Sequence, residues 1–203
     1  MTQILHVTCS PRGPASESSR LSRTIVDCLL ERDPMARVVE RAIGGDSLPH
    51  VDGDYALSQA SAADVSREGS MIRSEDLIRE LEGSDCLVIG TPMHNFTVPS
   101  TLKAWVDHVV RVRRTFDVSP EGKIALLRNR PVLVAISSGG RFSGAHARQP
   151  DFLTPYLKAV LGIIGLHDLS VFSVEGTAAG PNAAALAQRA AECAIREHVA
   201  SLA

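Results

Sequence analysis

Serine side chains gather in a short loop near the start of the chain. Ser10 is followed by Ser16 and Ser18, and residues with apolar side chains at helical spacing come directly after them. Serine hydroxyls and the free amides at a helix start can donate hydrogen bonds to an anion, and the helix dipole favours negative charge there. This loop predicts a phosphate-binding site. The alternative is that its serines and prolines only form a turn and cap the helix.

Two later loops are also chemically unusual. Residues 91–96 read TPMHNF and residues 137–140 read SSGG, and each segment follows a strongly apolar run. Taken singly, either loop is as compatible with an ordinary turn as with a binding site.

Several well-known site motifs are absent or incomplete. The chain has neither the Gly-x-Gly-x-x-Gly motif nor the Gly-x-x-x-x-Gly-Lys motif, which weighs against a dinucleotide fold and against nucleoside triphosphate hydrolysis. A cysteine-phosphatase loop starting at Cys9 would need arginine where Ala15 stands. The seven histidines lack metal-ligand spacing, and no segment fits the Gly-x-Ser-x-Gly elbow of a hydrolase. We therefore expect no metal site.

Short apolar runs alternate with helical patterns along the chain, and these elements must position the loops. Strands are expected at residues 3–8, 37–41, 86–89, 131–137 and 169–174, and helices at 21–29, 71–81, 102–109, 153–164 and 182–202, with a loop-rich crossing at 42–66.

Five apolar strands alternating with helices predict an α/β fold. It would be a three-layer, doubly wound, five-stranded parallel sheet, with strand order 2-1-3-4-5 and one domain over residues 1–203. Ligands bind such sheets at the carboxyl ends of the strands, where the strand order reverses. Strands 1 and 3 flank that point. The loops after strands 1, 3 and 4 should therefore meet there.

Composition excludes several classes of protein. With 44% hydrophobic and 22% charged residues among 203, the chain is not expected to be disordered. A formal charge of −2 gives no reason to expect a nucleic-acid partner, and no apolar run is long enough to span a membrane. The start of the chain does not read as a secretory signal. The four scattered cysteines are expected to be free, buried thiols, and the protein to be cytoplasmic.

Taken together, the three loops resemble one enzyme family. Ser10 with Ser16-Glu-Ser18, then Pro92-Met-His-Asn-Phe96, then Ser137-Ser-Gly-Gly140 follow the order and spacing of the FMN-dependent NADH-azoreductases, which are flavodoxin-like quinone reductases. The segments 154–157, 161–165 and 175–176 resemble the C-terminal half of that family. The resemblance covers nearly the whole chain.

The resemblance implies an FMN enzyme that transfers two electrons from NADH or NADPH to a quinone or azo compound in a ping-pong cycle. It also implies a homodimer with the site at the subunit interface. The flavin carries the chemistry, so no side chain is expected to be catalytic. The alternative is a flavodoxin-type electron carrier without a substrate site; the small net charge and the length weigh against it.

Site roles follow from the same resemblance. The phosphate would be held by the first loop, with Glu17 acting through its amide, and the ring by the other two loops. His94 and Phe96 would also contact the substrate. The implied cofactor-binding residues are Ser10, Ser16, Glu17, Ser18, Pro92, Met93, His94, Asn95, Phe96, Ser137, Ser138, Gly139 and Gly140.

Two positions depart from the family pattern. His94 stands where tyrosine is usual and Ser138 where arginine is frequent, which leaves acceptor preference and the choice between NADH and NADPH open. Three arginines, Arg111, Arg113 and Arg114, follow the helix that contains Trp105. We expect a solvated face there; the alternative is a role in attracting the pyrophosphate of the nicotinamide nucleotide.

Overall fold

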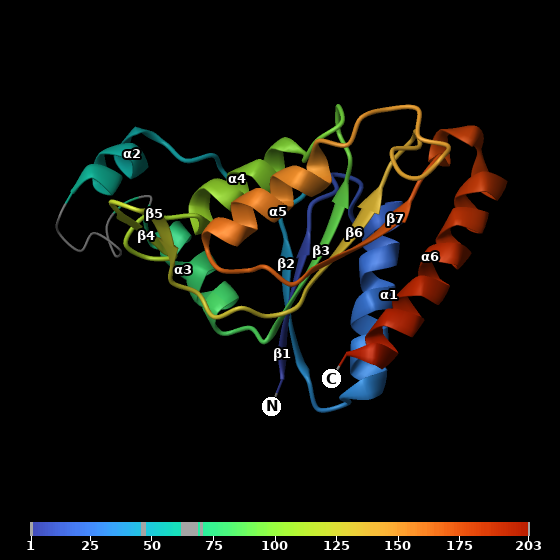
Figure 1. The fold of residues 1–203 in the computed structure, drawn as a ribbon, viewed down its shortest axis with the longest axis horizontal. Helices are drawn as coiled ribbons and strands as arrows, with labels where there is room; N and C mark the ends of the chain where they lie inside the picture. Colours follow the sequence, from blue (N-terminus) through green and yellow to red (C-terminus); the bar gives the residue numbers. More distant parts are fainter. Residues whose placement is uncertain (1, 46–47, 62–68, 70, 203) are drawn as a thin grey trace.

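Five parallel strands form the central sheet of the computed structural model, which describes residues 2–45, 48–61, 69 and 71–202 (Figure 1). Their order in space is β2-β1-β3-β6-β7, which is the expected order 2-1-3-4-5. All four pairings are parallel. The strands are β1 (Gln3–Thr8), β2 (Arg37–Ala42), β3 (Cys86–Pro92), β6 (Val132–Ser137) and β7 (Leu169–Val174).

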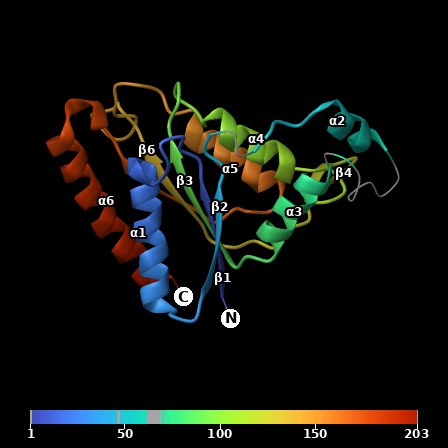
Figure 2. The same cartoon turned by 180° about the vertical axis from the view of Figure 1, so that it is seen from behind.

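Helices cover both faces of this sheet, so the central strands are buried on both sides. Figures 1 and 2 show helices on each face of the sheet. One face carries α1 (Glu17–Arg32) and α6 (Pro181–Ser201). The other face carries α3 (Met71–Glu82), α4 (Ser100–Val109) and α5 (Leu153–Ile163).

Side chains of β1 alternate between the two halves of the core. Ile4 packs with the residues of α1 and α6, whereas Leu5 and Val7 pack with those of α3, α4 and α5. The fully buried Trp105 of α4 lies in the second half. Both halves pack on the same sheet, which fixes the strand ends from two sides.

Two elements were not expected. The crossing at 42–66 contains α2 (Gly53–Ala60), which begins where the Asp52 side chain accepts a hydrogen bond from Tyr55 N at 2.8 Å. Part of that crossing lies outside the described residues. An antiparallel hairpin of β4 (Phe116–Ser119) and β5 (Gly122–Ala125) precedes β6.

The arginine cluster after α4 is not a solvated face. Arg111 is buried, and its guanidinium donates to Glu75 Oε2 at 2.6 Å and to Ser74 Oγ at 3.0 Å. Arg114 also pairs with Glu75, at 3.1 Å. Because Glu75 belongs to α3, these ion pairs join α3 to the chain that follows α4. Arg113 alone is exposed, and it donates to backbone carbonyls at 59 and 61.

The cysteines are free, as expected, but they are not all buried. Cys9, Cys28 and Cys86 are buried, whereas Cys193 on α6 is exposed. Burial raises the pKa of Cys86 to about 12 and raises that of Cys9 further, so both remain neutral thiols. Within the described ranges, no helix has the length and apolar character needed to cross a membrane.

Candidate functional site

Three loops meet at the carboxyl ends of β1, β3 and β6, which are neighbours in the sheet. They surround a cavity of about 210 Å³. Nine residues that the sequence singled out line it: Ser10, Ser16, Glu17, Pro92, Met93, His94, Ser137, Ser138 and Gly139. Four others, Ser18, Asn95, Phe96 and Gly140, belong to the same loops but do not line the cavity.

The first turn of α1 forms one end of this cavity. Ser16 caps the helix: its Oγ accepts a hydrogen bond from Ser19 N at 3.2 Å, and its carbonyl accepts one from Arg20 N at 3.0 Å. Among the described residues, the amides of Glu17 and Ser18 have no hydrogen-bond partner. Two free amides, the hydroxyls of this turn and the positive helix end together suit an anion.

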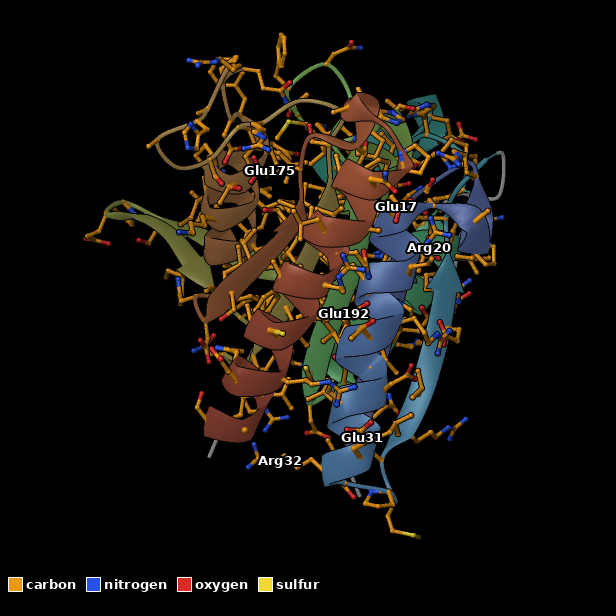
Figure 3. The ribbon with its side chains drawn as sticks, turned by 90° about the vertical axis from the view of Figure 1, so that its right-hand side faces the viewer. Glu17, Arg20, Glu31, Arg32, Glu175 and Glu192 are labelled. Atoms are coloured by element: carbon orange, nitrogen blue, oxygen red, sulfur yellow. The ribbon has the colours of Figure 1, made fainter. Side chains whose placement is uncertain are left out.

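The Glu17 carboxylate is not aimed at this anion-binding end. It pairs with the Arg20 guanidinium one turn along the helix. Figure 3 shows both residues at the upper end of α1. The side chain of Glu17 therefore faces a cation of its own helix, and its amide remains free for a ligand.

Two glycines let neighbouring segments approach the first loop. A Cβ on Gly90 of β3 would overlap Ser22 Oγ of α1 and lie 3.0 Å from the Ser18 carbonyl. A Cβ on Gly44, after β2, would overlap the Ser10 carbonyl. Glycine at position 90 thus allows α1 to sit this close to β3, and glycine at position 44 allows the segment after β2 to pass this close to the first loop.

The second loop makes a tight turn with unusual backbone angles. His94 and Thr97 exchange two backbone hydrogen bonds of 3.0 Å, and the two residues between them, Asn95 and Phe96, have φ of 49° and 70°. Asparagine tolerates positive φ, but a bulky residue such as phenylalanine rarely adopts it. The turn holds the Phe96 ring outward, and 43% of its surface is exposed. Strain of this kind is concentrated at functional sites.

The third loop is bonded to the end of β7 and the segment after it. Ser138 N donates to the Val174 carbonyl at 2.9 Å, and Thr177 N and Ala178 N donate to the carbonyls of Ser138 and Gly139 at 3.2 Å. These bonds present the Gly139 backbone to the cavity.

Glu175 anchors the continuation of this loop. Its carboxylate accepts hydrogen bonds from Phe142 N at 2.7 Å, Ser143 N at 3.1 Å and two serine hydroxyls. Burial alone would raise the pKa of Glu175, but these hydrogen bonds outweigh it and lower that pKa below its usual value. Glu175, which Figure 3 places near the same end of the molecule as Glu17, is thus a structural carboxylate.

Sequence reasoning missed two residues of the site. Gln149 donates to Ser138 Oγ at 3.0 Å and to Met93 Sδ at 3.1 Å, which joins the second and third loops. Its amide also occupies the place that a Cβ of Gly140 would need. Thr177 lines the cavity. No motif marks either residue; Gln149 stands outside the recognisable SSGG segment, and its role depends on how the loop folds back.

Comparisons with known proteins identify the family of the chain. A family model described as having the flavodoxin-like fold matches residues 2–199. An FMN-dependent NADH:quinone oxidoreductase of Pseudomonas fluorescens is 46% identical over 183 residues, which are 90% of this chain and 88% of that protein. Another, of Burkholderia lata, is 47% identical over 178 residues, 88% of this chain and 87% of that protein.

Solved structures show the same fold. An azoreductase from Bacillus anthracis has a TM-score of 0.86 and 22% identity, with all of both chains covered. A second azoreductase from that organism, solved in complex with FMN, has a TM-score of 0.77 and 21% identity over 98% of this chain and all of that one.

Proposed function

The chain belongs to the flavodoxin-like family of FMN-dependent NADH:quinone oxidoreductases, and we propose that it binds FMN in the three-loop cavity and transfers electrons from NADH to quinones or azo compounds. One observation carries the proposal. The cavity joins an anion-binding helix end to the loops that follow β3 and β6, so that one site can hold a phosphate and a flat ring together. The sequence identity of 46–47% with two FMN-dependent NADH:quinone oxidoreductases supports the proposal.

The residues at the helix end fit the phosphate of FMN. Ser10 accepts a hydrogen bond from Arg12 N at 3.2 Å, which leaves its hydroxyl hydrogen free to donate. The amides of Glu17 and Ser18 supply further donors, and the Ser16 hydroxyl would donate as well once its hydrogen turns from Ser19 Oγ to the phosphate. A phosphate dianion would gain the helix dipole as well, with no competing carboxylate because Glu17 is paired with Arg20.

The two other loops fit the ring. Pro92, Met93, His94 and Asn95 would border one side of it, and Ser137, Ser138, Gly139 and Gly140 the other. When bound, FMN supplies the redox chemistry, so no side chain need act as acid or base. The chain's part is to bind and orient. The amides of Met93, His94 and Ser138 are bonded within the protein, whereas those of Gly139 and Gly140 have no partner among the described residues and would donate to the ring, where negative charge develops on reduction.

Phe96 and His94 are suited to the substrate side. Both are exposed, and the strained turn keeps the Phe96 ring at the rim. An aromatic face there would stack on a nicotinamide or a quinone, and His94 would donate to an acceptor oxygen. We propose that donor and acceptor occupy this one place in turn, which gives ping-pong kinetics, and that either NADH or NADPH serves as donor.

The size of the cavity favours a second copy of the chain as part of the site. About 210 Å³ is less than the roughly 300–1,000 Å³ of typical ligand pockets. Exposed phenylalanines stand beside it: Phe152 N donates to the Phe96 carbonyl at 3.0 Å, and 59% of the Phe152 surface is exposed. We propose a homodimer in which the partner covers this rim; light scattering at micromolar concentration tests it.

A cytoplasmic location and a single domain over 1–203 stay predictions.

Steady-state kinetics test the proposed function. Purified protein with FMN should oxidise NADH in the presence of a benzoquinone or an azo dye, and parallel lines in double-reciprocal plots are expected for ping-pong kinetics. A protein that binds FMN but shows no NADH turnover with either acceptor class would support the electron-carrier alternative.

A further inference from the structure

A buried histidine lies beneath the phosphate end of the proposed site. His6 is on β1, on the face that α1 covers, and only 1% of its surface is exposed. Its Nε2 lies 2.8 Å from Ser22 Oγ of α1, and its Nδ1 lies 2.8 Å from Glu40 Oε2 of β2. The strand register places His6 directly beside Glu40. The imidazole therefore bridges the sheet and the helix.

The two ring nitrogens make different contacts. The Nε2 contact with Ser22 is a hydrogen bond, whereas Nδ1 faces the Glu40 carboxylate without the alignment of a directed hydrogen bond. The Glu40 contact is therefore electrostatic, and it favours a protonated ring. Which nitrogen of a neutral ring carries hydrogen must be inferred from the partners.

Ser22 links this histidine to the first turn of the helix. Its Oγ lies 3.1 Å from the Ser19 carbonyl, to which it can donate. Ser19 in turn accepts from Ser16 Oγ at 2.8 Å through its own hydroxyl. Ser16 lines the cavity. Hydrogen bonds thus connect His6 to the backbone of Ser19, and the Ser19 hydroxyl to Ser16, the residue expected to hold the phosphate.

A hydroxyl has one hydrogen, so Ser22 can satisfy only one acceptor at a time. If the His6 ring is neutral with hydrogen on Nδ1, Ser22 must donate to Nε2, and the Ser19 carbonyl loses its donor. If the ring is protonated, Nε2 donates to Ser22, and Ser22 donates to Ser19. A neutral ring with hydrogen on Nε2 would also let Ser22 donate to Ser19, but it turns the bare Nδ1 lone pair toward the Glu40 carboxylate, 2.8 Å away. The protonated state completes the set without that repulsion and places a positive charge beneath the first turn of α1.

We propose that His6 is a positioning residue for the phosphate end of the site: through Ser22 it holds the first turn of α1, and it takes up a proton more readily when a phosphate is bound there. The proposal rests on the proposed function, because it requires a phosphate at that turn. By linkage, protonation of His6 must strengthen phosphate binding by the same factor.

The charges around His6 set its resting state. Burial lowers the pKa of His6, and Arg23 of α1 lowers it further, whereas Glu40 and Asp27 act to raise it. Arg23 also donates to Glu40 at 2.7 Å and thus shares that carboxylate. The net lowering of its pKa leaves the His6 ring neutral at neutral pH. A phosphate dianion bound near the first turn of α1 can therefore cause the ring to take up a proton.

Flavin affinity measured as a function of pH tests this role. FMN binding to flavin-free protein is followed by fluorescence quenching from about pH 5 to about pH 8 for wild type and His6→Gln. Glutamine keeps a donor for Ser22 but cannot titrate. The ratio of the two dissociation constants removes the effect of the phosphate's own ionisation, because that ionisation is common to both proteins. We expect the variant's relative weakness to grow about fivefold or more towards low pH.

Three controls make the outcome specific. Riboflavin lacks the phosphate and should show a ratio independent of pH. His108→Gln alters another buried histidine, on α4, whose Nε2 contacts the Pro49 carbonyl, and should also give a ratio independent of pH. Ser22→Ala removes the link and should reproduce the His6→Gln profile, which covers the case in which His6→Gln does not fold.

The outcomes are distinct. In wild-type protein, the NMR pKa of His6 should rise when FMN binds, and an unchanged pKa would overturn the proposal. A pH-independent ratio for both His6→Gln and Ser22→Ala with FMN would also overturn it, with the proposed function intact. Wild-type protein that binds no FMN at any pH would refute the proposed function and this inference with it.

Discussion

Some side chains at the start of α1 both stabilise the helix and are expected to bind the ligand, and substitutions can separate these two roles. Ser16 caps the helix through Ser19 N and also lines the cavity. Ser18, in contrast, is fully buried and contacts Ser16 Oγ at 3.4 Å, so only its amide is placed to meet a ligand. The expected role of Ser18 is therefore a main-chain one.

Ser16→Ala should weaken FMN binding by about 1.5–3 kcal/mol, because a hydrogen bond to a charged phosphate is lost. Loss of the cap should also lower the free energy of unfolding by about 1 kcal/mol. Isothermal titration and urea denaturation measure the two effects separately.

Asp52→Ala is the matched control, because Asp52 caps α2 in the same way but is not among the residues that line the cavity. It should lower stability and leave FMN affinity unchanged. Equal FMN affinity in Ser16→Ala and wild type would remove Ser16 from the phosphate site.

At the scale of elements, close approach between α1 and the sheet is the feature on which the site depends. Gly90→Ala should move the first turn of α1 away from β3, because its Cβ would overlap Ser22 Oγ. We expect a loss of about 1–3 kcal/mol of stability from this overpacking, together with weaker FMN binding. Gly53→Ala, at the start of α2 and with open space around the position, should change neither.

The join between α3 and the chain after α4 is a second element-scale feature. Burial alone would raise the pKa of Glu75, but hydrogen bonds from Arg114 and Arg111 outweigh it and lower that pKa. Glu75→Gln leaves Arg111 buried without its charged partner, which should cost about 3–5 kcal/mol in urea denaturation. Glu31→Gln breaks the exposed pair with Arg196 and should have no measurable effect; a similar loss in both variants would contradict this account.

The central strands and most helices could be predicted because they bury a continuous apolar run or stripe; Cys86–Ile89 and Val132–Ile136 are examples. The hairpin could not be: β5 is exposed at every position, so no burial pattern marks it. Arg111 was misjudged because an arginine inside the core is recognisable only once its partner, 36 residues away, is known. Gln149 escaped notice for the same reason.

For the whole molecule, buried histidines should set the response of stability to pH. Burial lowers the pKa of both His6 and His108. Below about pH 6.5 the unfolded chain therefore binds more protons than the folded one, and stability falls as pH falls. Urea denaturation at several pH values should show this decline; His6→Gln should make it shallower, and a decline of unchanged steepness would exclude His6 as a contributor.

Carboxylates should add a second loss at lower pH. The pKa values of Glu75, Asp85 and Glu175 are lowered in the folded state, so their contribution is present above the ordinary carboxyl pKa and disappears as pH falls through the lowered values. Stability should therefore fall in two stages on acidification, the histidine stage first.

The central claim is that the three-loop cavity holds an FMN that NADH can reduce. The most direct measurement is the visible spectrum of the purified protein with FMN, recorded without oxygen before and after NADH is added. We expect a shifted flavin spectrum on binding and rapid bleaching with NADH, followed by recovery when a quinone is added. Absence of FMN binding would contradict the assignment of the cavity, and bound flavin that NADH cannot bleach would contradict the proposed activity.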